Sequence, residues 1–365
     1  MAAPTLGVLV YLLACVAARL IGPREWGLLT TSTRRLLPLR ASGVFPERPM
    51  RILITGGAGF IGSNLVDACL AEGHDVAVAD DLTAGSAANV AGRARLYEVD
   101  VRTPALDEVV AAERPDIVSH HAAQVSVRRS VEEPLLDAET NILGSLNVLE
   151  AARRHGVRRV VFASTGGAIY GEVEGPAAAE DHPCRPRSPY AVAKLAVEHY
   201  LEGYRPTGLE TIVLRYANVY GPRQDPHGEA GVVAIFIQRI LGGLTPTIFG
   251  DGEQVRDFVY VDDVVRANLL AHAVPLADGS PQVFNVGTGR GTTVGMLWSA
   301  VAAIAGATVR PSHEPARTGD LVRSVLDPTR ARTVLGWEPR VEVADGLGRT
   351  WQWFAARAGR DRVAV

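Results

Sequence analysis

The sequence predicts a doubly wound α/β fold, in which a parallel β-sheet carries helices on both of its faces. Three observations lead to this prediction. An apolar, β-rich strand pattern at 52–55 runs directly into a glycine-rich turn, and a helical pattern begins immediately after that turn. Further short apolar strand patterns follow at 75–80, 95–99, 117–124 and 159–165. The chain has 365 residues and 47% hydrophobic content, which is enough for one large or two medium domains.

The glycine-rich turn after the first strand has the Gly-x-x-Gly-x-x-Gly spacing of a dinucleotide site between a strand and a helix. Gly56 permits the tight turn, Gly59 lets the backbone approach phosphates, and Gly62 lets the helix pack closely against the sheet. Phe60 and Ile61 begin the helix, whose N-terminal N–H groups and positive dipole favour a diphosphate. The expected fold is therefore of the Rossmann type, with a dinucleotide bound at this turn.

The ends of the second and third strand patterns indicate which dinucleotide is bound. Asp80 ends the second pattern, where a carboxylate would accept hydrogen bonds from the adenosine ribose and repel a 2′-phosphate. No arginine follows until Arg93, so the sequence favours NAD over NADP. Asp100 and Val101 follow the third pattern, where a carboxylate is expected to meet the adenine amino group.

The fourth strand pattern ends in small residues and two histidines. Ala122 and Ala123, with Gln124 after them, would let the chain approach the cofactor closely. We expect His120 and His121 to pack at the strand end, because no other His or Cys has metal-ligand spacing to them. The sequence therefore predicts no metal site.

We expect the reactive chemistry at Tyr190 and Lys194. Ser188 and Pro189 have the character of an N-cap and a first helical residue, which puts the tyrosine and the lysine one turn apart on one helix face. Lys194 is the only lysine among 37 Lys and Arg residues, so this position has kept an ammonium where the rest of the chain uses guanidinium. The ammonium and a positive nicotinamide would favour the phenolate of a phenol whose ordinary pKa is ~10. The preceding strand ends in Thr165, at the sheet edge where ligands bind.

These motifs resemble the extended short-chain dehydrogenase/reductase family, and more closely its UDP-glucose (UDP-galactose) 4-epimerase branch. The resemblance covers Met50 to about Phe354 and rests on the segments 55–64, 190–194, 214–223, 250–263 and 285–289. It implies NAD as the cofactor, a UDP-hexose as the substrate and interconversion of UDP-glucose and UDP-galactose through a 4-keto intermediate. Members of the family are often homodimers.

The resemblance also implies roles for individual residues. Tyr190 would remove the proton from the sugar 4-hydroxyl, Lys194 would bind the nicotinamide ribose, and Thr165 would hydrogen-bond the 4-oxygen. Asn141 would steady the site beside the cofactor and the catalytic helix. The expected substrate-binding residues are Asn218 for phosphate and sugar, Arg256 and Arg317 for the diphosphate, Asp320 for the uridine ribose, and Ser324 at the wall of the sugar pocket.

Two positions depart from the pattern of many epimerases. Gly166 stands where many of them have Ser, and the adjacent Thr165 is the natural replacement. Ser324 stands where some have a large aromatic residue, and its small side chain extends the expected substrates to UDP-N-acetylhexosamines.

Several other functions remain open. A nucleotide-sugar 4,6-dehydratase usually carries Thr-Asp-Glu where this chain has Thr165, Gly166 and Gly167, because eliminating water needs an additional acid and base. The two glycines favour the epimerase. A uronate epimerase, a decarboxylase and a non-catalytic NAD-binding sensor remain alternatives, since a fold does not fix a function.

Charge and cysteine content restrict partners and location. The formal net charge is −3 and the arginines are scattered, so we expect no nucleic-acid partner. Three cysteines, Cys15, Cys69 and Cys184, are too few and too unevenly spaced for a disulfide framework, which favours a reducing compartment such as the cytoplasm.

We divide the chain into an N-terminal extension at 1–49, an NAD-binding Rossmann domain at 50–228 and a substrate-binding lobe at 229–365. The apolar run at 6–18 is shorter than the ~20 residues of a membrane span, and no basic residue precedes it. Either translation begins at Met50 or the run is a weak membrane anchor; the first interpretation is preferred.

Overall fold

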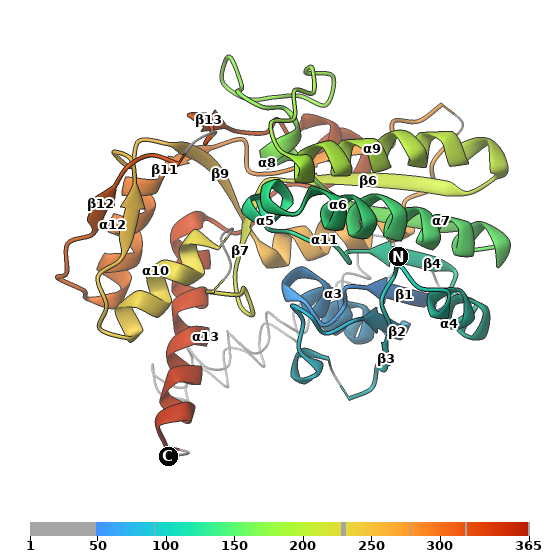
Figure 1. Ribbon diagram of the computed structural model, residues 1–365, viewed down its shortest axis with the longest axis horizontal. Helices are drawn as coiled ribbons and strands as arrows, with labels where there is room; N and C mark the ends of the chain where they lie inside the picture. Colours follow the sequence, from blue (N-terminus) through green and yellow to red (C-terminus); the bar gives the residue numbers. More distant parts are fainter. Residues whose placement is uncertain (1–48, 91, 228–230, 278, 318–319, 364–365) are drawn as a thin grey trace, which may run out of the picture. The chain divides into compact units, whose positions relative to one another are not determined.

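A computed structural model describes residues 49–363, apart from residues 91, 228–230, 278 and 318–319. The predicted extension therefore lies, except for its last residue, outside the described residues, and so does the apolar run at 6–18. In the described part, seven parallel strands form one sheet (Figure 1). Their order is β10 (Val283–Val286), β6 (Glu210–Tyr216), β5 (Arg159–Thr165), β4 (Ile117–His120), β1 (Arg51–Thr55), β2 (Asp75–Asp80) and β3 (Arg95–Glu98).

Helices cover both faces of this sheet, which confirms the predicted doubly wound fold. On one face, α3 (Phe60–Ala71) packs against α11 (Val261–Ala273). The other face is covered by α4 (Ala105–Glu113), α7 (Gly144–Arg154) and α9 (Pro189–Tyr204). Between β4 and α7 the chain forms the short helices α5 (Val127–Glu132) and α6 (Pro134–Ala138) and the π-helical turn η3 (Glu139–Leu143). The short helix α8 (Gly166–Ile169) follows β5. The single-turn 3₁₀ segments are η2 (Ala87–Asn89) and η4 (Arg205–Thr207).

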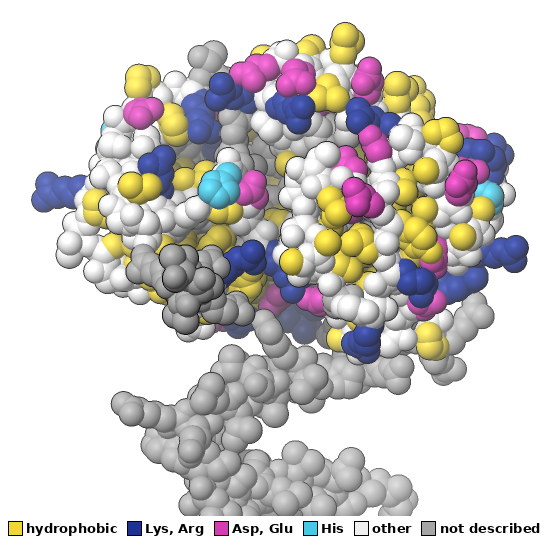
Figure 2. Space-filling view, turned by 60° about the horizontal axis from the view of Figure 1, so that its bottom comes forward, with side chains coloured by type: hydrophobic (Ala, Val, Ile, Leu, Met, Phe, Trp, Pro, Cys, Tyr) yellow, Lys and Arg dark blue, Asp and Glu magenta, His cyan; other side chains and the backbone are white. Residues whose placement is uncertain are grey.

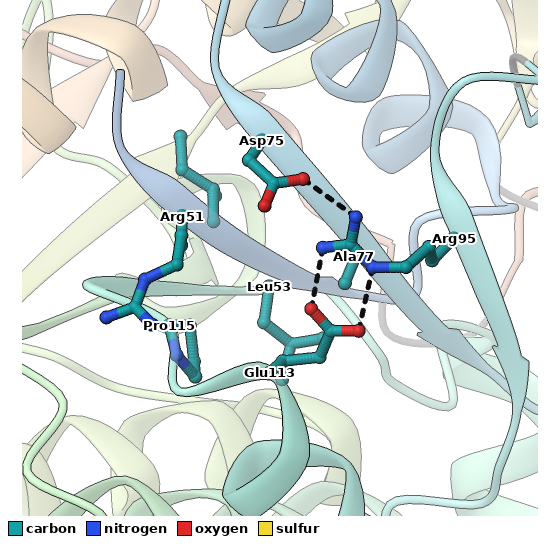
Figure 3. A pocket seen from close by; sticks show the side chains of 8 residues that line it. Arg51, Leu53, Asp75, Ala77, Arg95, Glu113 and Pro115 are labelled. Carbon is teal, nitrogen blue, oxygen red and sulfur yellow. Dashed lines mark hydrogen bonds and ion pairs between the residues drawn. The ribbon is translucent and has the colours of Figure 1, made fainter. Parts of the chain in front are cut away.

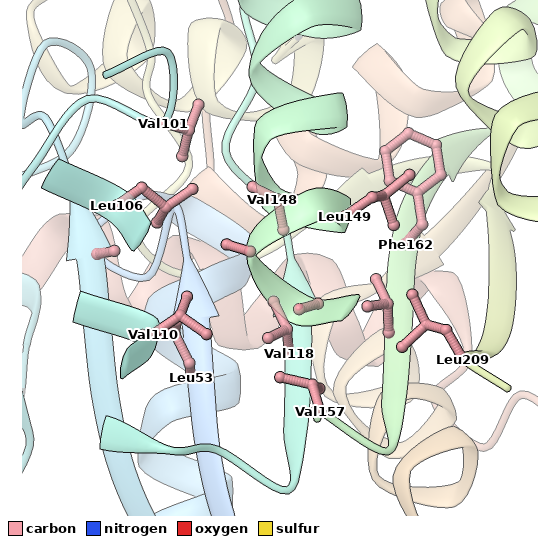
Figure 4. Close-up of a cluster of buried hydrophobic side chains, with 14 of the residues drawn as sticks. Leu53, Val101, Leu106, Val110, Val118, Val148, Leu149, Val157, Phe162 and Leu209 are labelled. Atoms are coloured by element: carbon pink, nitrogen blue, oxygen red, sulfur yellow. The ribbon is translucent and has the colours of Figure 1, made fainter. Parts of the chain in front are cut away.

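A hydrophobic core lies between the sheet and helices α4, α7 and α9. Figure 4 shows Leu53, Val118 and Phe162 of the strands facing Val110 and Leu149 of these helices, and all five side chains are buried. The strands are almost continuous apolar runs because a parallel sheet covered on both faces buries both sides of each strand. This burial is the main source of the favourable free energy of folding.

A smaller set of strands and helices forms the rest of the described chain. Strand β9 (Val255–Tyr260) pairs with β7 (Asn218–Tyr220), β11 (Gly291–Thr293) and β13 (Arg323–Ser324), and β8 (Thr247–Phe249) pairs with β12 (Ser312–Glu314). Helices α10 (Val232–Leu241), α12 (Val294–Ala305) and α13 (Val343–Val363) pack against one another (Figure 1), and the π-helical turn η5 (Ala331–Leu335) precedes α13. The two parts exchange segments: β10 and α11 follow residue 228 yet belong to the large sheet and its helices. The division at residues 228 and 229 stays a prediction.

The two edges of the large sheet differ in character. At the amino ends of the strands, Arg95 donates to Glu113 at 2.8 and 2.6 Å and to Asp75 at 2.8 Å, which ties α4 to β2 and β3 (Figure 3). At the opposite edge, the strand order reverses between β1 and β4. Ligands of parallel α/β sheets bind beyond the carboxyl ends of the strands at such a reversal. The fold therefore places the candidate site where the glycine turn meets the segment after β4.

Within the part of the chain that the structure describes, no helix combines the length and the apolar character needed to cross a bilayer.

Candidate active site

The glycine turn after β1 forms a tight backbone cradle. Gly56 has φ of +67°, and a Cβ added there would lie 2.5 Å from the backbone nitrogen of Ala122, after β4. A Cβ added at Gly62 would lie 2.2 Å from the carbonyl oxygen of Gly56. Helix α3 has no side-chain cap at Gly59, so the N–H groups of its first turn, which begins at Phe60 and Ile61, are available to a ligand. This cradle fits the diphosphate of a dinucleotide.

We predict that Gly62→Ala weakens NAD binding at least tenfold, because the methyl group collides with a backbone carbonyl that cannot rotate away. Calorimetric titration of cofactor-free protein with NAD measures the change. Gly203→Ala is the matched control, since a Cβ at this exposed position of α9 meets nothing within 4 Å. Equal NAD affinity in the two variants would contradict the close approach at Gly62.

Asp80 lies beside this turn and organises the backbone around it. Its two carboxylate oxygens accept hydrogen bonds from the backbone N–H groups of Ala58 and Leu82, each at 2.9 Å. Burial raises the pKa of Asp80, while these two hydrogen bonds lower it. The structure thus brings Asp80 to the glycine turn, as its predicted contact with the ribose requires.

Asp100 and Val101 differ in exposure. The Asp100 carboxylate accepts from the backbone N–H and the guanidinium of Arg102, and the guanidinium is the main cause of its lowered pKa. Val101 is buried, with its side chain packed close to Gly144 of α7. The adenine contact of Asp100 and the cofactor contact of Val101 both stay predictions, and the side chain of Val101 packs in the core.

The segment after β4 is held by the side chain of Asn141. Its amide oxygen accepts from the backbone N–H of Gln124 at 2.9 Å, and its amide nitrogen donates to the backbone carbonyl of Gln124 at 3.0 Å. Ala122 is tied to β1, because its N–H donates to the hydroxyl of Thr55 at 3.3 Å. Ala123 lies between these two anchored residues. Asn141 therefore holds the backbone of the segment 122–124, which is predicted to form the cofactor wall, and this agrees with its predicted steadying role.

One residue in this network was missed by the sequence analysis. Asp137 is 1% exposed and accepts hydrogen bonds from the side chains of Gln124 and Asn141, at 2.9 and 2.8 Å. The available signal was an acidic residue next to two leucines, four positions before Asn141, a spacing that joins side chains along a helix.

Helix α9 begins as predicted and carries Lys194 into the interior. The hydroxyl of Ser188 accepts from the N–H of Ala191 at 3.2 Å, and Pro189 is the first helical residue. Lys194 is 4% exposed; its ammonium donates to the carbonyl of Ala163 at 2.9 Å and lies 4.7 Å from the ring centre of Phe162. Burial lowers the pKa of Lys194 to about 8. The ammonium is thus fixed at the end of β5.

Tyr190 lies one turn before Lys194, and its hydroxyl lies near the side chain of Thr165, at the end of β5. Burial raises the pKa of Tyr190 to about 12; the charge of Asp137 also raises it, and the neighbouring Thr165 side chain lowers it. A phenol in this setting is a weak acid until positive charge is added nearby. The structure therefore brings together the three residues predicted to act in catalysis.

A buried ion pair joins helix α9 to strand β6. Glu198, one turn after Lys194, accepts from Arg215 of β6 at 2.6 Å and from the hydroxyl of Ser164 at 2.5 Å. Both charged side chains are less than 10% exposed. Such a pair fixes the rotation of α9 against β5 and β6.

The predicted substrate residues come together beside Thr165. Ser324 of β13 is buried, and its hydroxyl is 3.4 Å from the carbonyl oxygen of Gly167. A Cβ added at Gly167 would lie 3.5 Å from the amide oxygen of Asn218 and 4.0 Å from the hydroxyl of Thr165. Ser324 pairs in register with Arg256 of β9. The sheet pairing thus connects the reacting end with the predicted diphosphate clamp.

The remaining two predicted substrate residues, Arg317 and Asp320, lie next to Arg256. Arg256 forms an ion pair with Asp320, and the backbone N–H of Asp320 donates to the carbonyl of Arg317 at 3.2 Å. The guanidinium of Arg317 lies 4.0 Å from the ring centre of Phe249, an aromatic residue that the sequence analysis did not assign to the site. Phe249 could have been suspected, because it directly precedes the motif 250–263.

The two histidines at the end of β4, His120 and His121, have structural partners. Both ring nitrogens of His120 are hydrogen-bonded, to Thr55 at 2.7 Å and Ser145 at 2.9 Å, and His121 bonds to Ser119 at 3.2 Å. Burial lowers the pKa of each histidine to about 3, so both are neutral at physiological pH. Among the described residues, no three His, Cys, Asp or Glu side chains are placed to hold one metal ion. On the face shown in Figure 2, charges of both signs are interspersed.

Comparison with known proteins agrees with this geometry. Residues 52–287 match the model of the NAD dependent epimerase/dehydratase family. A UDP-glucose 4-epimerase of Mycolicibacterium smegmatis is 48% identical over 311 residues, covering 84% of this chain and 98% of the relative. The structure also resembles UDP-glucose 4-epimerases from Thermotoga maritima, crystallised with UDP-glucose, and Thermus thermophilus, crystallised with NAD, at TM-scores of 0.81 and 0.79. Each is 50% identical, and the match covers 84% of this chain and 99% of the other.

These matches confirm the predicted fold, the family resemblance and NAD as the family's cofactor. The chain belongs to the NAD-dependent epimerase/dehydratase family.

Proposed function

We propose that the protein is an NAD-dependent UDP-glucose 4-epimerase that interconverts UDP-glucose and UDP-galactose. The observation that carries this proposal is the position of Tyr190 near Thr165 and one helical turn before the buried ammonium of Lys194. These groups stand at the carboxyl edge of the sheet, near the reversal of strand order where the glycine turn lies. The relatives at 48–50% identity are UDP-glucose 4-epimerases, which agrees with the proposal.

The chemistry requires one tyrosine for both half-reactions. Bound NAD supplies the acceptor and donor of the hydride at sugar C4. Tyr190 as phenolate takes the proton of the 4-hydroxyl while Thr165 hydrogen-bonds the 4-oxygen, and the C4–O bond becomes a carbonyl. After the 4-keto sugar has rotated in the site, the hydride would return to the opposite face of C4, and Tyr190 would return the proton to the 4-oxygen. The sugar is inverted at C4 with no net oxidation.

The remaining residues position the reactants. Lys194 holds the nicotinamide ribose and favours the phenolate of Tyr190 by its charge. Arg256 and Arg317 grip the diphosphate, which suits the planar fork of guanidinium, and Asp320 takes the uridine ribose. The ion pair between Arg256 and Asp320 holds both side chains at one place before substrate arrives.

Asn218 and Ser324 are placed to select the sugar. Both lie next to Gly167, beside Thr165, so they are close to the reacting end of the substrate. A small side chain at Ser324 leaves room for a 2-N-acetyl group, and we include UDP-N-acetylhexosamines among the substrates. Absence of detectable turnover of the N-acetylated pair would refute this extension.

A 4,6-dehydratase is the main alternative, and the structure offers an observation against it. A Cβ added at Gly166 would lie 2.5 Å from the side chain of Leu326, so an acidic side chain there needs a rearrangement of the pocket wall. Gly167 has space but no functional group. The acid and base that elimination of water requires are therefore missing from this segment.

Incubation of the purified protein with UDP-galactose, without added NAD, tests the proposal. Formation of UDP-glucose is expected, and its detection by chromatography would show both the activity and a retained cofactor. If UDP-glucose forms only when NAD is added, the proposed activity is supported, but the protein does not retain its cofactor through purification. A 4-keto-6-deoxy product would instead identify a dehydratase, and an unchanged sugar with NAD present would leave a cofactor-binding sensor.

We also propose that the enzyme is a homodimer. Supporting residues are exposed apolar side chains on elements that pack together, namely Val131 of α5, Leu135 of α6, Leu143 of η3 and Val192 of α9. Such a cluster is typical of an interface. Light scattering is expected to give twice the chain mass of 38.9 kDa, and a monomer would contradict the proposal.

We place the enzyme in the cytoplasm, because Cys69 and Cys184 are both unpaired thiols, as is usual in a reducing compartment. Recovery of the native protein outside the cytoplasmic fraction would refute this location.

A further inference from the structure

Asp137 is a buried carboxylate that the proposed reaction does not yet use. It lies on α6, which packs against α5, η3 and the catalytic helix α9. A carboxylate that is 1% exposed costs free energy unless donors and a counter-charge compensate for lost water. Burial raises the pKa of Asp137; the amides of Gln124 and Asn141, which donate hydrogen bonds to it, and the ammonium of Lys194, which provides a counter-charge, oppose this rise.

Hydrogen bonds connect Asp137 to the strand that ends at the glycine turn. Asp137 of α6 accepts a hydrogen bond from the side chain of Asn141, which lies in the π-helical turn η3. The backbone carbonyl of Asn141 accepts from the hydroxyl of Ser145 at 2.6 Å. Ser145 bonds to His120, and His120 bonds to Thr55, the last residue of β1. Isolated π-helical turns are frequent at functional sites. A single buried network thus joins the cofactor cradle to the wall of the catalytic site.

The charge of Asp137 acts on both reactive groups of α9. Burial penalises the ammonium of Lys194, and Asp137 is the stronger of two carboxylates that oppose this penalty. The second, Glu198, already has a partner in Arg215. The same negative charge raises the pKa of Tyr190 as well, but there it favours the neutral phenol over the charged phenolate.

We propose that Asp137 is a positioning residue of the reaction, which keeps Lys194 charged, keeps the proton on Tyr190 until positive charge is bound, and fixes Gln124 at the cofactor wall. This inference rests on the proposed roles of Tyr190 and Lys194. Its logic is electrostatic: oxidised NAD carries a positive nicotinamide, which offsets the carboxylate and allows the phenolate to form. In its absence the base stays protonated.

The other charged groups around α9 do not replace Asp137. His120 and His121 face Lys194 but are neutral. On α5, Arg129 is exposed and paired with Glu133, and Arg128 is paired with Glu132. The charges on the remaining packed elements have partners or lie toward the far end of the helix: Glu150 of α7, Arg205 of η4, and Arg159, Glu210 and Arg215 of β5 and β6.

The single lysine makes a direct test possible. Incorporation of lysine labelled with ¹³C at Cε gives one side-chain signal for the whole chain, and its shift with pH reports the pKa of Lys194. Asp137→Asn preserves shape and an acceptor oxygen but removes the charge. We expect the pKa of Lys194 to fall by about one unit or more, as for loss of a nearby opposite charge. Glu139→Gln, two residues away and solvent-exposed, is the matched control and should leave the titration unchanged.

Activity provides the second readout. In Asp137→Asn both limbs of the kcat–pH profile should move to lower pH, because the pKa of Tyr190 and the pKa of Lys194 both fall when the carboxylate is removed. Asp137→Glu, which retains the charge, should restore the titration toward that of the unmodified protein. A purely structural role predicts loss of activity at every pH with unmoved limbs.

An unchanged pKa of Lys194 in correctly folded Asp137→Asn would overturn the inference. The NMR titration needs no turnover, so this failure is distinguishable from failure of the proposed function. The latter would appear as a dehydratase product from UDP-galactose, or as no product with NAD present.

Discussion

Replacement of Tyr190 by Phe is expected to lower kcat by about 10³-fold, within the range of 10²–10⁴ for loss of a general acid–base group. The substitution removes only the hydroxyl, so the ring keeps its packing at the start of α9. NAD should stay bound, since the glycine cradle and Lys194 are untouched. Steady-state kinetics with UDP-galactose, combined with the absorbance of bound cofactor, measures both properties.

Tyr204→Phe is the matched control for this experiment. Tyr204 lies on the same helix, and its pKa is likewise raised to about 12, but its hydroxyl donates to Glu150 at the opposite end of α9. We expect a small loss of stability, of about 1 kcal/mol, and unchanged kcat. Activity near the original level in Tyr190→Phe would show that another group moves the proton.

The Lys194→Arg variant is expected to lose about 10²-fold or more in kcat/KM while the protein stays folded. The positive charge is retained, so the loss would come from shape. The ammonium is buried, donates to the carbonyl of Ala163 and lies over the ring of Phe162, and we expect the larger planar guanidinium to disturb these contacts. Kinetics and NAD titration on the same preparation separate turnover from cofactor affinity.

Arg205→Lys is the complementary exchange, at an exposed position just beyond the end of α9. Kinetics and NAD affinity should be unchanged there, because an exposed cation has no shape requirement. If Lys194→Arg were as active as this control, the single lysine of the chain would have no catalytic meaning.

Much of the fold could be predicted because its signals are local. The apolar strand patterns, the glycine spacing and the cap formed by Ser188 and Pro189 involve residues close in sequence, and backbone geometry allows few alternatives for them. The helical spacing that puts Tyr190 and Lys194 on one face is equally local. NAD was predictable for the same reason, from a turn and an acidic strand end.

Other features were not predictable because they join distant segments. Asp137 meets the catalytic helix only because the short helix α6 packs against α9, more than fifty positions later. The ion pair of Arg256 with Asp320 and the stacking of Arg317 on Phe249 likewise depend on how β8, β9 and β13 are arranged. No local signal shows that β10 joins the large sheet or that α11 packs against that sheet.

The sequence by itself determined the class of fold, the cofactor cradle and the reactive pair, since each depends on spacing within one or two turns of chain. Only the tertiary structure decided which charges surround that pair. The packing of α6 against α9 brings the carboxylate of Asp137 near Lys194 and Tyr190, and burial shifts the pKa values of both groups. Because electrostatic interactions strengthen where water is excluded, the packing sets how strongly each group holds its proton.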